Sequence, residues 1–254
     1  MKLFFRKSGE GHPLVILHGL FGMSDNWMTL SKRFSEENFL VYAIDARNHG
    51  RSPHSHEFNY PLMSDDLLRL MDDEHIEVAS VIGHSMGGKT AMWFSCVHPE
   101  RISKLVVADM APRYYPPHHQ SVIAAIHSID LDSITSRKDA ESGLRTTLKD
   151  EGTVQFLLKN LYWDEKEKLA WRFNLEGIEK NISSIGIALP GDYHFSGDTL
   201  FLRGGRSGYI TDADVPGIRK QFINSSVETI ANAGHWIHAE NPDGFFNSVN
   251  EFLK

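Results

Sequence analysis

Short apolar runs alternate with longer amphipathic segments along most of the chain. The runs that predict β-strands are Leu3–Arg6, Leu14–Leu17, Leu40–Ile44, Val78–Ile82, Leu105–Ala108, a stretch from Thr199, and Val227–Ile230. Continuous runs such as Leu40–Ile44 are typical of strands covered on both faces. The segments between the runs, such as Tyr60–Glu74, carry apolar residues at helical spacing. This alternation predicts an α/β fold with a mostly parallel sheet and helices on both faces.

The pattern changes between residues 113 and 190. No apolar run of similar strength occurs there, and the best-defined segments are helical: Val122–Ile129, Ala140–Leu148 and Val154–Leu161. Because this block follows the carboxyl end of a strand, where open α/β sheets bind ligands, it is placed to cover an active site. We expect residues 113–190 to form a helical cap, and residues 1–112 and 191–254 to form the core. The alternative is a set of helices that only completes the core.

The candidate chemistry centres on the turn Gly83-His84-Ser85-Met86-Gly87, between an apolar run and a helical segment. A Gly-x-Ser-x-Gly turn that reverses a strand directly into a helix needs its glycines because the backbone crowds its neighbours. The turn forces the central serine into a strained conformation and holds its hydroxyl at the edge of the sheet. The next N–H and the positive end of the helix dipole point at the same spot. Ser85 is therefore the predicted nucleophile and Met86 a predicted oxyanion donor.

A second glycine-rich loop, His18-Gly19-Leu20-Phe21-Gly22, follows the run Leu14–Leu17. A His-Gly pair directly after an apolar strand suits a loop that must bring a backbone N–H close to a ligand. We take Leu20 as the second oxyanion donor, with Phe21 as the alternative.

A histidine partner for Ser85 is expected near the end of the chain. His235 follows a glycine in the loop that leaves the last predicted strand, and from there it can reach over the edge of the sheet. His238 competes for this role. It lies three residues into the predicted final helix, and we expect it to point elsewhere.

The acid of a Ser-His-acid set has three candidates. The loop after the strand from Thr199 has Ser207 and no carboxylate at its start, and Asp212 and Asp214 lie a few residues further on. Asp109 ends the strand that follows the one leading to Ser85. The carboxyl ends of neighbouring parallel strands face the same crevice, which favours Asp109 over Asp212 and Asp214.

The run Leu40–Ile44 ends in a loop that combines charges with glycine and serine, Asp45-Ala46-Arg47-Asn48-His49-Gly50-Arg51-Ser52. Two opposite charges this close in sequence usually satisfy each other, so we expect Asp45 and Arg47 to hold the shape of the loop. His54 and His56 follow, but no third ligand stands at a spacing that would complete a metal site.

Composition narrows the classes of partner. The 254 residues are 41% hydrophobic and 23% charged, as in ordinary globular proteins. A net charge of −7 without a basic stripe argues against nucleic acid. The single cysteine, Cys96, excludes an internal disulfide and fits a reducing compartment. We expect a cytoplasmic protein, since the first residues lack the apolar region of a signal peptide and no run approaches the roughly 20 apolar residues of a membrane helix.

Together these motifs resemble the α/β-hydrolase superfamily over essentially the whole chain. The resemblance is carried by His18-Gly19, Asp45-x-Arg47-x-x-Gly50-x-Ser52, Gly83 to Gly88, and Gly234-His235. The segments Gly152–Lys159 and Trp171–Asn174 are similar to the caps of a bacterial esterase branch. The resemblance implies an α/β-hydrolase fold with an eight-stranded sheet and a helical cap. It also implies a serine esterase that acts on short-chain esters and acyl-CoA thioesters, with its acid at Asp109.

The sequence thus predicts a Ser85-His235-Asp109 triad that forms an acyl-enzyme and requires no metal or organic cofactor. The expected partner is a small-molecule ester or thioester, with no nucleic acid or membrane, and the chain is expected to be a monomer or small homo-oligomer. Alternatives are a C–C bond hydrolase, perhydrolase or lyase using the same triad, and a ligand-binding sensor with slow hydrolysis. Candidate substrate-binding residues are His18, Phe21, His84, Phe156 and Trp236.

Overall fold

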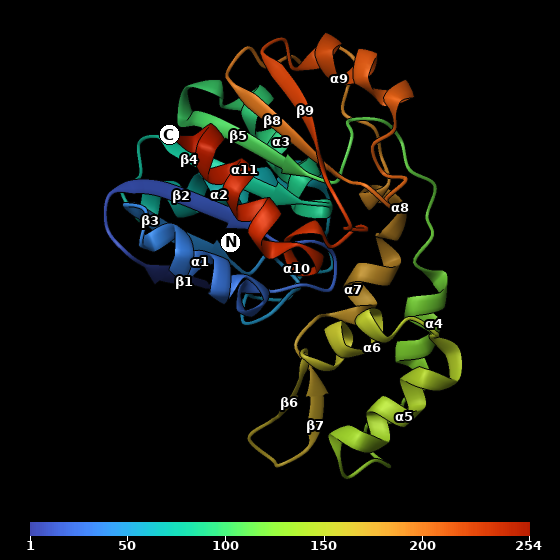
Figure 1. The fold of residues 1–254 in the computed structure, drawn as a ribbon. Coiled ribbons are helices and arrows are strands. Elements are labelled where there is room, and N and C mark those ends of the chain that lie inside the picture. The colour runs from blue at the N-terminus through green and yellow to red at the C-terminus, as the bar shows by residue number, and fades with distance from the viewer.

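The computed structural model describes residues 1–254 and contains one large sheet. Its seven strands lie in the order β1-β3-β2-β4-β5-β8-β9 (Figure 1). Only β1 is antiparallel, and it pairs with β3. The strands are β1 (Phe5–Ser8), β2 (His12–Leu17), β3 (Phe39–Ile44), β4 (Ala79–His84), β5 (Ile102–Ala108), β8 (Thr199–Gly204) and β9 (Ser225–Ile230). The predicted mostly parallel α/β fold is confirmed.

The sheet has seven strands, so the eight implied by the family resemblance is wrong for this chain. Each apolar run identified in the sequence forms one strand, with the first displaced by two residues to Phe5–Ser8. That strand is already the edge of the sheet, because it pairs only with β3. The sequence contains no further apolar run that could pair with either edge strand, β1 or β9.

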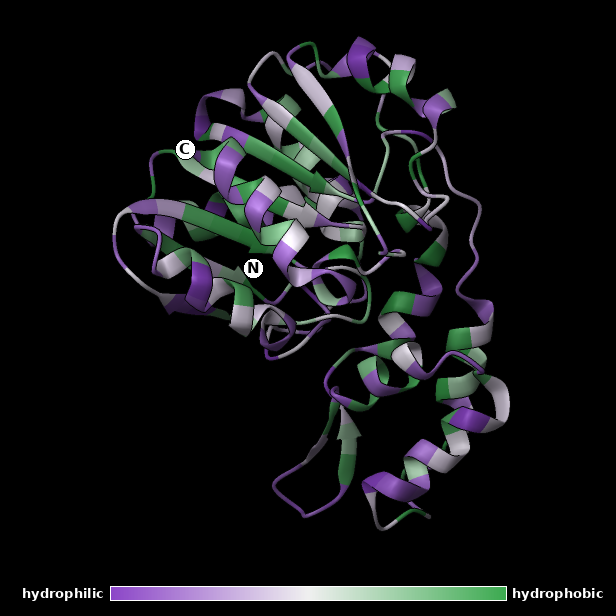
Figure 2. Ribbon diagram, in the orientation of Figure 1, coloured by the Kyte–Doolittle hydropathy of each residue, from purple (hydrophilic) through white to green (hydrophobic).

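Helices cover both faces of the sheet, as the continuous apolar strands require. In β2, Leu14 and Ile16 pack with α1 (Met28–Ser35) and α11 (Pro242–Leu253). Val15 and Leu17 point to the opposite face, which is covered by α2 (Tyr60–Asp73), α3 (Met86–Val97) and α9 (Val215–Gln221). Figure 2 shows the central strands mostly in the green of hydrophobic residues, whereas the helices carry both green and purple residues. No helix of the structure has the length and apolar character required to span a membrane.

The helices begin where the sequence supplies caps. The Asn59 side chain accepts a hydrogen bond from the Leu62 N–H at 3.0 Å, and Pro61 lies in the first turn of α2. Helix α11 starts in the same way, with the Asn241 side chain accepting from the Gly244 N–H at 2.9 Å. Such side chains satisfy backbone donors that a helix end leaves free. These local signals fix the ends of the helices that flank the sheet.

Residues 113–190, which we call the inserted segment, connect β5 to β8. Five helices account for most of its regular structure: α4 (Gln120–His127), α5 (Arg137–Thr147), α6 (Glu151–Leu158), α7 (Leu175–Lys180) and α8 (Ile182–Ile185). It also contains an antiparallel hairpin of β6 (Leu161–Trp163) and β7 (Leu169–Trp171), so the expectation of helices alone was incomplete. Strands of three residues are too short to show a period in the sequence. Helix α5 and this hairpin lie farthest from the sheet (Figure 1).

The inserted segment packs on the loops at the carboxyl ends of the strands. Its buried residues form one apolar cluster with side chains of the core, among them Leu20, Phe21, Met63 and Met86. The cluster joins the segment to the Gly-rich loop after β2 and to the start of α3. The packing therefore places the segment beside the edge of the sheet where Ser85 lies.

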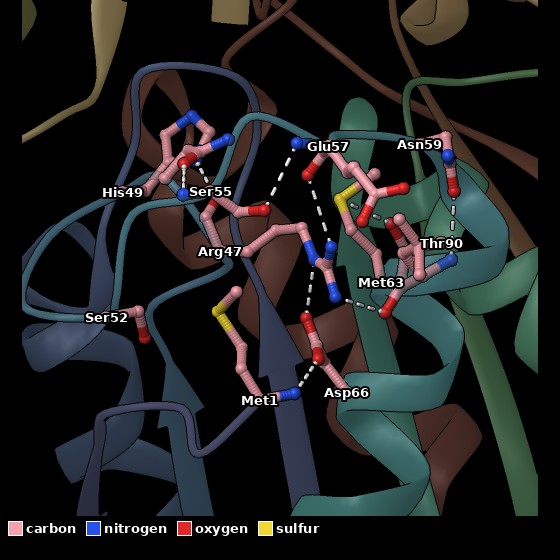
Figure 3. A network of polar contacts seen from close by, with 12 residues as sticks. Met1, Arg47, His49, Ser52, Ser55, Glu57, Asn59, Met63, Asp66 and Thr90 are labelled. Atoms are coloured by element: carbon pink, nitrogen blue, oxygen red, sulfur yellow. Dashed lines mark hydrogen bonds and ion pairs between the residues drawn. The ribbon is translucent and has the colours of Figure 1, made fainter. Parts of the chain in front are cut away.

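The loop after β3 is held by a buried ion pair that the sequence did not predict. Arg47 binds Asp66 of α2 with 2.6 Å between Nε and Oδ2, and both side chains are at most 6% exposed. Arg47 also donates to the carbonyls of Glu57 and Leu62, while the amino group of Met1 contacts Asp66 (Figure 3). The predicted pairing of Asp45 with Arg47 is wrong.

The carboxylate of Asp45 instead accepts from backbone N–H groups of its own and a neighbouring loop. The Ser24 N–H lies 2.6 Å from Oδ1 and the Arg51 N–H 2.8 Å from Oδ2. Gly50 is required within this turn, because its φ is +57° and a Cβ atom there would lie 2.1 Å from Asp45 Oδ2. Both charges hold the loop as expected, but each does so through a different partner.

Replacing Arg47 with Met should lower the free energy of unfolding by about 3 kcal/mol, because it leaves a buried carboxylate with fewer partners. Urea denaturation measures the change. Arg69→Met is the control, since Arg69 on the same helix as Asp66 makes an exposed pair with Asp73 at 3.7 Å, and such pairs contribute little. Equal losses in the two variants would contradict this reading of the network.

Candidate active site

The turn between β4 and α3 has the geometry that the sequence predicts. Ser85 has φ 53° and ψ −114°, a conformation that a residue with a side chain rarely adopts. A Cβ atom at Gly83 would lie 2.3 Å from the Gly87 carbonyl oxygen, and one at Gly87 would lie 2.3 Å from the Leu17 carbonyl oxygen. Neither distance leaves room for a side chain. The two glycines are therefore needed for close approach of the backbone.

Ser85, His235 and Asp109 form a continuous hydrogen-bonded chain. His235 Nε2 lies 3.0 Å from Ser85 Oγ, and His235 Nδ1 lies 2.8 Å from Asp109 Oδ2. If Nδ1 carries the proton and donates to the carboxylate, Nε2 is left to accept from the serine hydroxyl. The structure thus brings together the three residues that the sequence analysis selected from distant parts of the chain.

Asp109 is fully buried and held by two further donors. The Gly204 N–H lies 3.0 Å from Oδ1, and the Ser207 hydroxyl lies 2.5 Å from Oδ2. The other acid candidates are engaged elsewhere: Asp212 pairs with Arg203 at 2.6 Å, and Asp214 pairs with Arg113 at 2.8 Å. Of the three candidates, only Asp109 is hydrogen-bonded to His235.

Two backbone N–H groups near Ser85 have no hydrogen-bond partner within the protein, those of Leu20 and Met86. The alternative donor Phe21 is already occupied, since its N–H donates to His49 Nε2 at 3.1 Å. His49 Nδ1 in turn donates to the Arg47 carbonyl at 2.9 Å, so both nitrogens of this imidazole are hydrogen-bonded to backbone groups. The arrangement leaves Leu20 and Met86 as the pair available to bind an anion.

A cavity of about 170 Å³ lies above Ser85 and His235. All five predicted substrate-binding residues line it: His18, Phe21, His84, Phe156 and Trp236. The two histidines among them also have internal bonds. His18 uses both nitrogens, one with the Gly19 carbonyl at 2.7 Å and one with the Ala46 N–H at 3.0 Å. His84 Nε2 lies 2.9 Å from the His235 carbonyl oxygen.

Several residues at the site were missed by the sequence analysis. The Tyr209 ring stacks on His235 with 3.8 Å between centroids and an angle of 16° between the planes. His118, whose Nε2 contacts the Tyr209 hydroxyl, and His119 line the cavity from the inserted segment. In the sequence, Ser207 marks only a position without a carboxylate. In the structure its hydroxyl binds Asp109, which follows the neighbouring strand β5.

His238 lies in a separate short helix, α10 (Ile237–Glu240), and not in the final helix. Its ring stacks on Trp27 with centroids 4.2 Å apart and lines the cavity, while His235 is the histidine bonded to Ser85, in line with the expectation that His238 does not reach the serine. No hydrogen bond joins His238 to Ser85 or Asp109, and its Nδ1 is buried without a partner. Burial, and then the charges of His235 and Lys159, lower the pKa of His238 to about 3.

The fold, the serine turn and the hydrogen-bonded residues at the edge of the sheet define an α/β hydrolase. A family model described as "alpha/beta hydrolase fold" matches residues 12–242, and the chain belongs to this family. It is 36% identical to Esterase YbfF of Escherichia coli (strain K12) over 244 residues, which cover 95% of this chain and 92% of that protein. The sequence-based resemblance to bacterial esterases is confirmed.

Two further relatives extend the comparison. The chain is 38% identical to the sn-1-specific diacylglycerol lipase ABHD11 of Danio rerio over 258 residues, covering 98% of this chain and 81% of that protein. A solved structure described as a marine microorganism esterase superposes with a TM-score of 0.97 at 43% identity, covering 100% of both chains. These esterase- and lipase-type relatives support ester hydrolysis as the class of reaction.

Replacing His238 with Phe should stabilise the protein increasingly as the pH falls below 6.5. An imidazole with a pKa near 6.5 when unfolded and about 3 when folded binds more protons in the unfolded state between these values. It therefore lowers the free energy of unfolding by about 1.4 kcal/mol for each pH unit in that range, and not above it. Phe keeps a ring against Trp27 and removes the titration.

Urea denaturation at pH 7.5, 6 and 5 measures this effect as a widening difference between the variant and the wild type. The control is His54→Gln, which removes an exposed imidazole. A difference for His238→Phe that is constant with pH would contradict the buried neutral state of this ring.

Proposed function

We propose that this protein is a serine esterase that hydrolyses carboxylic esters through a Ser85-His235-Asp109 triad. The observation that carries the proposal is the hydrogen-bonded chain from Asp109 through His235 to Ser85. This chain meets the geometric requirement for a nucleophile with an adjacent base whose orientation a third group fixes.

In the proposed reaction, Ser85 Oγ attacks the acyl carbonyl while His235 Nε2 takes the hydroxyl proton. Asp109 keeps the imidazole in the required tautomer and stabilises its cation. The tetrahedral intermediate collapses as His235 returns the proton to the leaving alcohol, which leaves an acyl-Ser85 ester. Water deprotonated by His235 then attacks this ester, releasing the carboxylic acid and restoring the serine.

The Leu20 and Met86 N–H groups are the proposed oxyanion donors. Both lack partners inside the protein, and the Met86 N–H also lies at the N-terminus of α3, where the helix dipole favours negative charge. Each such donor typically lowers the barrier by about 3 kcal/mol. This contribution requires that the loop of Leu20 keep its position relative to the start of α3.

The inserted segment is the proposed cap over this site, since it supplies His118, His119, Phe156 and other walls of the cavity. The volume of about 170 Å³ is below the roughly 300–1,000 Å³ of sites for drug-sized ligands. A small cavity with aromatic walls favours short acyl chains. Short-chain acyl thioesters, whose carbonyl carbon is attacked in the same way, are the proposed second substrate class.

Ser85→Ala should abolish turnover of a p-nitrophenyl ester series from acetate upward, because no other hydroxyl is bonded to His235. Release of p-nitrophenol measures the rate, and circular dichroism checks the fold. Repeated turnover by the wild type is the expected result. A single burst would point to a ligand-binding sensor, whereas a folded protein without ester turnover would favour the lyase or C–C hydrolase reactions of the same triad.

Asp109→Asn should lower kcat by about 10⁴-fold, because the amide disfavours the tautomer that accepts the serine proton. Asp212→Asn is the matched control, since Asp212 follows the neighbouring strand but pairs with Arg203 at the surface. Steady-state kinetics with p-nitrophenyl acetate compare the two. If Asp212→Asn produced the large loss and Asp109→Asn did not, the assignment of the acid would be wrong.

A further inference from the structure

Lys89 carries a buried amino group close to the proposed nucleophile. It lies one turn into α3, where its N–H donates to the Ser85 carbonyl at 3.0 Å, and it is 1% exposed. A positive charge in the first turn of a helix opposes the helix dipole, and its removal from water is unfavourable. Burial, and then the like charge of Arg113, lower the pKa of Lys89 to about 7. A lysine in this position therefore needs specific partners.

The partners of Lys89 are the two ends of the inserted segment. Its Nζ donates to the Arg113 carbonyl at 2.7 Å and also to the Ile187 carbonyl. Arg113 is the first residue of the segment, and Ile187 lies three residues before its last. One amino group thus binds both chain ends where they leave and re-enter the core.

The two ends run close together at this point, and we call residues 112–115 and 186–189 the neck. The Leu189 N–H donates to the Pro112 carbonyl at 2.7 Å, and the Tyr115 N–H donates to the Gly186 carbonyl at 2.8 Å. A Cβ atom at Gly186 would lie 2.1 Å from the Tyr115 carbonyl oxygen. The neck is therefore a paired, tightly packed connection, and Lys89 is its link to α3.

The neck also contacts the side chains around His235. The Tyr115 ring lies 5.3 Å from Lys89 Nζ and 3.9 Å from the Arg113 guanidinium carbon. The Tyr115 hydroxyl donates to the Tyr209 carbonyl at 2.6 Å, and the Tyr209 ring stacks on His235. The position of the neck thus affects the position of Tyr209, which forms the wall of the cavity beside the proposed base His235.

We propose that Lys89 is a positioning residue that fastens both ends of the inserted segment to the nucleophile helix and so sets the width of the substrate cavity. The position of residues 118–157, which supply the upper wall of the cavity, then depends on the two carbonyl contacts of Lys89. The effect of Lys89 on substrate binding rests on the proposed esterase function. The attachment of the inserted segment to α3 through Lys89 does not depend on that function.

Limited digestion with trypsin tests the attachment independently of activity. The bond after Arg113 lies in the neck, next to the exposed Tyr114, and its cleavage rate reports how often the neck opens. Lys89→Met keeps the length of the side chain and removes its donors, so fragments 1–113 and 114–254 should form about tenfold faster or more, as expected when charge-assisted hydrogen bonds are lost. Lys89→Gln, which retains one amide donor group, should give an intermediate rate.

Lys104→Met is the matched control. The Lys104 Nζ donates to the Phe252 carbonyl at 2.7 Å, the same length as the bond to Arg113, but it joins β5 to the end of α11. This variant should leave cleavage after Arg113 unchanged. Equal acceleration in Lys89→Met and Lys104→Met would overturn the proposal, as would unchanged cleavage in Lys89→Met.

Kinetics test the effect on the cavity. With a folded Lys89→Met protein, KM for p-nitrophenyl hexanoate, whose longer chain we expect to contact the wall that the inserted segment supplies, should rise several-fold, while kcat and the KM for p-nitrophenyl acetate stay near the wild-type values. A fall in kcat for both esters would show that the residue supports the triad as a whole and would overturn the positioning role. If the wild type hydrolysed neither ester, the proposed function would fail while the digestion result would still decide the attachment.

Discussion

The contact on which the rest of the site depends is the close approach of the turn after β4 to the end of β2. Gly87 lies so near the Leu17 carbonyl that no side chain fits between them. This contact fixes the N-terminus of α3 beside the loop that carries Leu20. It also leaves Ser85 no relaxed conformation, because the chain must reverse within one residue. The proposed nucleophile and the two free N–H groups are therefore parts of one packed unit.

The loop of Leu20 is in turn shaped by neutral imidazoles and by the inserted segment. His18 bonds to Ala46, and His49 binds the Phe21 N–H, which excludes Phe21 as a free donor. The Asn160 side chain donates to the Phe21 carbonyl at 2.9 Å from the inserted segment. Burial lowers the pKa of both imidazoles, so they remain neutral acceptors for backbone N–H groups. Residues that the sequence offers as substrate ligands thus also define the shape of the loop.

The fold and the meeting of Ser85, His235 and Asp109 could be predicted because their signals are local. The strands appear as apolar runs, and the serine turn has a fixed spacing of glycines. Asp109 could be selected as the residue bonded to His235 because it directly ends a strand next to β4. Partners that depend on tertiary packing could not be found in this way. Arg47 pairs with Asp66, 19 residues away on α2, and Tyr209 reaches His235 across two loops. Nothing in the neighbouring sequence marks either pair.

Hydrogen bonds at the neck join the inserted segment to α3. The segment touches the loop of Leu20 through Asn160, the wall beside His235 through Tyr115, and α3 through Lys89. A rigid insertion with only apolar contacts could slide, since such contacts are not directional. Hydrogen bonds to backbone carbonyls fix a single register, because each requires a particular distance and direction. The polar contacts at the neck therefore add a fixed register to the apolar cluster that the segment shares with the core.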